Sequence, residues 1–199
     1  MPRRTVALAL FFLLFTSFKG QPSESGMATA TELAGSPLAA APSAGTQAAA
    51  RLVSPWTPTE LVIPRIGVDA KIEARGLDAN RNLDTPGDFR DVAWYRLGPA
   101  PGLPGNALIN GHVNWWTGSA VFTRLSQLRA GDEVVVIRGD GSRVVFKVTT
   151  RTVVAAGARI PSLFAPSPVA TLTLITCTGV WDTARGTDTQ RLLVGAVLA

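Results

Sequence analysis

The 199-residue chain contains one cysteine, one histidine and three lysines, and each scarcity excludes a class of protein. A single cysteine cannot form a disulfide within the chain, so a disulfide-stapled domain is excluded. One histidine and one cysteine cannot build a zinc cage, and the loop 153–169 has no carboxylate for calcium, so we expect no metal or other cofactor. The basic residues, mostly arginine, form no cluster with interleaved aromatics, so we expect no nucleic-acid partner.

The N-terminus has the layout of an export signal. Arg3 and Arg4 precede an uncharged apolar run from Val6 to Phe15, and Lys19 ends the segment. The run is short for a membrane span, which needs about 20 residues, yet no small-residue cleavage site follows it directly. Residues 1–19 are therefore either a cleaved signal peptide or a membrane anchor, with the anchor favoured. In both cases the body lies outside the cytoplasm: an anchor would hold it at the cell surface, and a cleaved signal would leave it secreted.

Residues 20–59 are predicted to be a disordered linker. They are mostly Ala, Ser, Thr, Gly and Pro, with too few large apolar side chains to offset the entropy of ordering them. Such a stalk suits a partner embedded in the cell envelope. Met27 offers an alternative start that would remove the N-terminal segment. The body, residues 60–199, has the usual length of one domain.

The body is predicted to be all-β, with many short strands and little helix. Its β-branched and aromatic runs are separated by Gly, Pro, Asp and Asn, a pattern typical of a barrel or sandwich. The turn 139–142 marks the clearest hairpin. Only 119–128 is predicted to be helical, with a second, weaker turn of helix at 161–166. The eight candidate strands are 61–63, 70–73, 93–96, 107–111, 133–138, 144–149, 171–177 and 192–198.

The only cysteine ends a strand with an alternating pattern, TLTLITC over 171–177. Leu172 and Leu174 are predicted to face the core, and Cys177 lies on the opposite, less apolar face. An oxidising compartment exposes a free thiol to damage. Two interpretations remain: a small buried apolar residue, or a nucleophile with a base or a cation beside it.

His112 and Arg191 are the residues that can partner such a thiol. His112 follows a predicted strand and a glycine, where a side chain projects from the end of a sheet. Arg191 directly precedes the last predicted strand, 192–198, and antiparallel pairing would bring it near Cys177. A fixed cation there would lower the thiol pKa and bind an oxyanion. Taken singly, His112 could be an ordinary hydrogen-bonded loop residue, and Arg191 could be an ordinary solvated residue at the start of a strand.

The chain has INGHVN at 109–114, LTLITC at 172–177 and Arg191 after them. Together these motifs resemble the sortases, the cysteine transpeptidases of Gram-positive envelopes. The resemblance covers residues 60–199 and is greatest for class F, with class E as a neighbour. Class E usually has His-Pro after its cysteine, where this chain has Thr178 and Gly179, and Asn114 stands where an acidic residue is expected.

The resemblance implies a fold and a chemistry. The fold is an eight-stranded sortase-type β-barrel with one or two short helices. Cys177 would be the nucleophile, His112 its proton-transfer partner, and Arg191 the group that binds substrate carbonyls and the oxyanion. The substrate would be a protein with a C-terminal LPxTG-like sorting signal, cleaved between Thr and Gly through a thioester. The acceptor would be an amine, expected to be that of a peptidoglycan precursor.

Four further residues are candidates for substrate binding. Thr176 would shape the oxyanion pocket through its hydroxyl or backbone, or is only a good strand former. Trp115, Trp116 and Trp181 flank His112 and Cys177 in sequence, and would wall a peptide groove or fill gaps in a small barrel.

Two rival functions come from other classes. An L,D-transpeptidase also uses cysteine on the cell wall, but the S-x-G-C context of that family is absent around Cys177. A noncatalytic envelope-binding barrel would keep the fold without the chemistry. Thiol reactivity separates that barrel from an enzyme.

Overall fold

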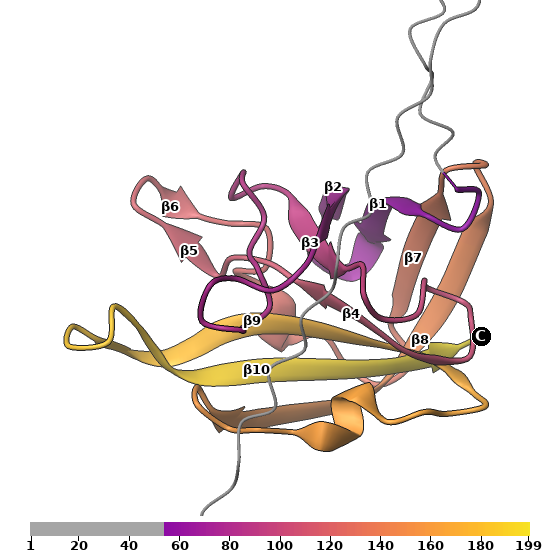
Figure 1. Ribbon diagram of the computed structural model, residues 1–199. Helices are drawn as coiled ribbons and strands as arrows, with labels where there is room; N and C mark the ends of the chain where they lie inside the picture. Colours follow the sequence, from indigo (N-terminus) through magenta and orange to yellow (C-terminus); the bar gives the residue numbers. More distant parts are fainter. Residues whose placement is uncertain (1–53) are drawn as a thin grey trace, which may run out of the picture. The chain divides into compact units, whose positions relative to one another are not determined.

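A computed structural model describes residues 54–199 as a closed barrel of eight strands (Figure 1). The strands close in the order β1-β2-β3-β4-β9-β10-β8-β7. The pairs β2–β3 and β4–β9 are parallel and the other barrel pairs are antiparallel. The barrel strands are β1 Pro58–Ile63, β2 Val68–Arg75, β3 Val92–Tyr95, β4 Gly105–Asn110, β7 Glu133–Arg138, β8 Arg143–Ala155, β9 Ala170–Asp182 and β10 Thr187–Leu198.

This architecture confirms the predicted all-β, eight-stranded barrel, and each predicted strand overlaps an observed one. Two further short strands, β5 Asn114–Trp115 and β6 Gly118–Ser119, form a separate hairpin. The long strands β9 and β10 run together and continue into a projecting hairpin (Figure 1).

Alternating side chains fill the barrel interior. Leu172 and Leu174 of β9 are fully buried, and Leu192, Val194 and Ala196 of β10 pack in the same cluster. Each large aliphatic side chain buried in this way contributes about 1.5–3 kcal/mol. The predicted inward faces of both strands are thus confirmed, and the alternate residues of these strands are directed away from the core.

The predicted helix over 119–128 is wrong. In its place the structure has a 3-10 turn, η2 Leu125–Gln127. The cause is the spacing of Phe122, Leu125 and Leu128, which are at most 1% exposed and recur every third residue. A helix with three residues per turn aligns such side chains on one face, and Leu125 N donates to Phe122 O at 3.0 Å.

The other helical turns of the described residues are also of the 3-10 type. They are η1 Pro64–Ile66 and η3 Pro161–Phe164. η3 confirms the weaker turn predicted at 161–166.

The barrel begins two residues before the predicted boundary at residue 60. Pro58 and Thr59 belong to β1, and the Thr59 hydroxyl donates to Ile137 O at 3.1 Å. Before the strand, the guanidinium of Arg138 lies 4.6 Å from the Trp56 ring centroid. The predicted signal or anchor, residues 1–19, and most of the predicted linker lie outside the described residues. Within residues 54–199, no helix is long and apolar enough to cross a bilayer.

This boundary makes a deletion experiment informative. Deleting residues 20–53 is expected to leave the melting temperature unchanged, because their composition provides no core. Extending the deletion to residue 59 removes the Trp56–Arg138 contact and the start of β1, so the melting temperature should fall by roughly 5 °C. Thermal circular dichroism of the two deletions measures the difference. Equal losses in both would contradict this boundary.

Candidate active site

Cys177 lies on β9, between β10, which carries Arg191, and β4, which ends two residues before His112. Arg191 is its direct partner in the antiparallel pair β9–β10. On the other side, the parallel register of β4 with β9 ends at Asn110 and Ile175, two residues before His112 and Cys177. Gly111 N continues this pairing by donating to Ile175 O at 3.1 Å. Cys177 and Arg191 therefore lie side by side on adjacent strands, and His112 lies on the segment that follows the third, β4.

The backbone that carries His112 is fixed on both sides. Thr176 donates its hydroxyl to Gly111 O at 2.8 Å, and Phe122 N donates to His112 O at 2.9 Å. A Cβ at Gly111 would lie only 2.8 Å from Val121 Cγ1, so no larger residue fits without displacing this segment. The Thr176 side chain is buried and its proton is committed to this bond. Its hydroxyl therefore holds the histidine segment against β9.

Arg191 is held by the chain just before it. Its Nη1 donates to the carbonyls of Asp188 at 2.9 Å and Gln190 at 2.8 Å, and its Nη2 donates to the Thr187 hydroxyl at 2.9 Å. A guanidinium has five N–H donors, so these bonds leave two for a substrate. The planar group is therefore oriented before any ligand arrives.

Burial and nearby charges decide the protonation of the thiol. Burial is the largest cause and raises the pKa of Cys177, while the Arg191 charge lowers it. The charge of Asp188 raises the Cys177 pKa further, and a hydrogen bond with the Thr187 side chain lowers it. Because the net shift is upward, the free protein holds the protonated thiol at neutral pH. Attack by sulfur thus requires a base, and His112 is the candidate base on the neighbouring segment.

Asp188→Asn is expected to lower the Cys177 pKa, because it removes a negative charge that disfavours the thiolate. The rate of iodoacetamide alkylation, measured against pH, should then reach its midpoint at lower pH than in the wild type. Asp182→Asn is the control, since Asp182 lies on the same hairpin but is bound by Arg185 at 2.9 Å. An unchanged profile in Asp188→Asn would remove Asp188 from the electrostatics of the thiol.

A β-bulge directly follows the cysteine. Thr178 pairs with Gln190 and Trp181 with Asp188, so β9 advances three residues where β10 advances two. Gly179 takes a φ of 95° within the bulge. Bulges bend a strand and redirect its side chains. Neither this bulge nor the contacts of Thr187 and Asp188 were predicted from the sequence, where the only local sign of the bulge is the glycine two residues after the cysteine.

Gly179→Ala is expected to destabilise the barrel by about 1–3 kcal/mol, because a side chain at this φ is strained. The added Cβ would also lie 2.6 Å from Thr189 Oγ1. Gly157→Ala is the matched control, since nothing lies within 4 Å of a Cβ there. Denaturant unfolding measures both variants. Equal midpoints would show that the bulge tolerates a side chain.

The candidate tryptophans differ in their surroundings. The Trp115 ring stacks on Phe89 with centroids 5.6 Å apart and meets the His112 ring edge-on at 5.0 Å. Trp116 packs on Trp115 at 4.3 Å and is 84% exposed. Trp181 lies beyond the bulge on β9 and is also exposed. All three lie outside the barrel core, so they do not fill gaps in it, and their role as groove walls stays a prediction.

Comparison with known proteins identifies the family. The sequence profile of the Sortase domain matches residues 61–199. The chain belongs to the sortase family. This confirms the predicted family and a transpeptidase function of the sortase type, in a family of cell-surface enzymes. No protein of curated function matches the chain.

Solved sortase structures share the fold. Sortase C-1 of Actinomyces oris is 26% identical over 71% of this chain and 73% of its own, with a TM-score of 0.54. Sortase A of Corynebacterium diphtheriae is 23% identical over 72% of this chain and 60% of its own, with a TM-score of 0.55. Sortase C1 of Streptococcus agalactiae is 23% identical over 71% of this chain and 68% of its own, with a TM-score of 0.57. These are class A and class C sortases, so the class F assignment stays a prediction.

Proposed function

We propose that this sortase is a class F cysteine transpeptidase that cleaves an LPxTG-like sorting signal between Thr and Gly. Cys177 is its nucleophile, His112 its acid and base, and Arg191 its oxyanion-binding residue. The observation that carries the proposal is the direct pairing of Cys177 with Arg191, next to the fixed segment that bears His112. The assignment to class F rests on the sequence ITCTGVWD at 175–182, which resembles that class.

Acylation begins with proton transfer from the Cys177 thiol to His112. The thiolate attacks the threonine carbonyl carbon, a C–S bond forms, and the oxyanion accepts hydrogen bonds from the two remaining Arg191 donors. The His112 imidazolium then gives its proton to the glycine nitrogen, the C–N bond breaks, and a thioester remains on Cys177.

Deacylation reverses these roles. An amine of a peptidoglycan precursor loses its proton to His112 and attacks the thioester, and the sulfur leaves as the thiol. Water substitutes slowly for the amine. Because burial raises the pKa of the Cys177 thiol, little of the free enzyme holds a thiolate, so low turnover is expected. Residues 1–19 would keep the enzyme at the membrane, outside the cytoplasm.

Intact-protein mass spectrometry with a panel of sorting peptides tests the function. A sortase should gain the mass of the acyl fragment up to threonine and release the glycine fragment. Hydroxylamine should remove the added mass, because it cleaves thioesters. A folded protein that binds a peptide but gains no mass with any of the panel would favour the noncatalytic envelope-binding barrel.

A further inference from the structure

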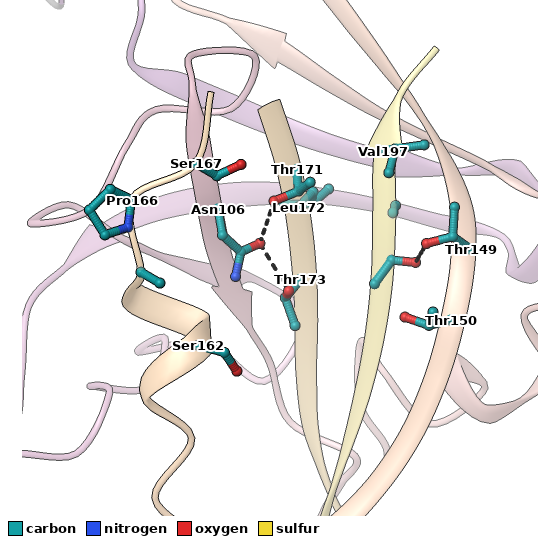
Figure 2. Close-up of a pocket in the computed structure, with 13 residues that line it drawn as sticks. Asn106, Thr149, Thr150, Ser162, Pro166, Ser167, Thr171, Leu172, Thr173 and Val197 are labelled. Carbon is teal, nitrogen blue, oxygen red and sulfur yellow. Dashed lines mark hydrogen bonds between the residues drawn. The ribbon is translucent and has the colours of Figure 1, made fainter. Parts of the chain in front are cut away.

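A hollow lies on the outer face of the barrel, over the first half of β9 (Figure 2). It has a volume of about 330 Å³. Strands β4, β9, β10 and β8 form its floor, and the loop around η3 forms one wall. None of its 13 lining residues is charged. Its polar lining consists of Asn106, Thr149, Thr150, Ser162, Ser167, Thr171 and Thr173.

Hydrogen bonds fix part of this lining. Asn106 accepts from the hydroxyls of Thr171 at 3.2 Å and Thr173 at 3.0 Å, and donates to Leu163 O at 3.1 Å (Figure 2). By contrast, the hydroxyls of Thr150 and Ser162 make no hydrogen bond within residues 54–199. They stand on opposite sides of the floor in Figure 2. The hollow thus offers a preformed base with free donors and acceptors at its sides.

The hollow continues the face that carries the catalytic candidates. Along β9 and β10, the pair Cys177–Arg191 is followed by Ile175–Leu193 and then by Thr173–Gly195. The hollow therefore begins four residues before Cys177 on the same side of the sheet. That separation is about 13 Å, which is also the length of four residues of extended peptide.

The position of His112 sets the direction of a bound substrate. His112 follows the C-terminal end of β4, and β4 runs parallel to β9, so His112 and the hollow lie toward opposite ends of these strands. The leaving amine must approach His112 to be protonated. The acyl side of the substrate then runs the other way along β9, toward the hollow.

We propose that this hollow is a subsite for the substrate residues directly upstream of the four-residue acyl motif, and that it selects small, uncharged polar side chains. This inference rests on the proposed function. Free hydroxyls on both sides match Ser, Thr, Asn and exposed peptide groups. A charged side chain would lose water there and meet no opposite charge among the lining residues.

The test uses the full-length chain in detergent, with hydroxylamine as acceptor and an LPATG peptide as the core substrate. A Ser-Thr-Gly-Ser extension on the N-terminal side is expected to raise kcat/KM roughly tenfold, the effect of one or two added hydrogen bonds. The same extension after the glycine, or an N-terminal extension of four lysines or four aspartates, should give no such gain.

Two matched variants locate the effect. Ser162 and Ser126 are exposed serines on different 3-10 turns, and only Ser162 lines the hollow. Ser162→Trp should bring the ratio of kcat/KM between extended and core peptides to about one, whereas Ser126→Trp should keep the wild-type ratio.

An equal gain from the C-terminal or charged extensions, or a full gain in Ser162→Trp, would overturn the subsite. Cleavage of the core without any extension effect would refute the subsite alone, and no acylation by any peptide would refute the proposed function with it.

Discussion

Replacement of Cys177 by alanine is expected to abolish the release of threonine hydroxamate from an LPxTG peptide in hydroxylamine. Hydroxylamine is a small, strong amine, so it intercepts a thioester even when the natural acceptor is unknown. Without sulfur no thioester forms, and the rate should fall by at least ~1,000-fold, as for the loss of other enzymic nucleophiles. His112→Ala should also lose most activity, because an amide nitrogen leaves poorly without a proton.

Thiol counting provides the control for this experiment. The chain has one cysteine, so a thiol reagent should label the wild type once and Cys177→Ala not at all. The side chain is partly exposed, so its loss should leave the melting temperature nearly unchanged. A folded wild type that neither labels nor yields hydroxamate from any sorting peptide would return the cysteine to a structural role.

Arg191→Lys is expected to lose at least ~100-fold in kcat although the charge is kept, the usual effect of losing an oxyanion donor. Three guanidinium bonds to the carbonyls of Asp188 and Gln190 and to the Thr187 hydroxyl hold the planar group in place. A lysine ammonium is a single point, and it cannot hold these acceptors while also offering a fork of donors to an oxyanion.

A second arginine on the same hairpin serves as the comparison. Arg185 is exposed and pairs with Asp182, so Arg185→Lys should retain near-normal turnover. The alkylation rate of Cys177 at neutral pH separates the two roles of Arg191, because a purely electrostatic role would be preserved in lysine. Near-normal kcat in Arg191→Lys would reduce the residue to that electrostatic role.

The strand pattern of this protein is readable from its sequence because alternate residues of the barrel strands join one interior core. That alternation predicts that Leu172 and Leu174 point into the core. Antiparallel pairing of the last strand with the cysteine strand predicts that Arg191 lies near Cys177. The order in which the barrel closes was not readable, since β9 lies between β4 and β10, and β4 is far from it along the chain. Such pairings depend on tertiary packing, which a local pattern does not encode.

Two local features were missed for different reasons. The stretch 119–128 looks amphipathic, but apolar residues at every third position suit a 3-10 turn better than an α-helix. The bulge at Gly179 shifts the register of β9 against β10 by one residue beyond Gln190, and this shift determines which β9 residues lie opposite Thr187 and Asp188. A single glycine at the end of a strand does not reveal such a shift.

Closure of the barrel also limits how any extended peptide can be recognised. Each of the eight strands has a hydrogen-bonded neighbour on both sides over part of its length, so the closed part of the barrel offers no edge to which a peptide could add as another strand. Beyond its pairing with β4, which ends at Ile175, β9 has only β10 beside it among residues 54–199. An extended peptide could therefore pair with backbone only along this short free edge next to Cys177, and elsewhere on the barrel its affinity must come from side chains and loops above the sheet.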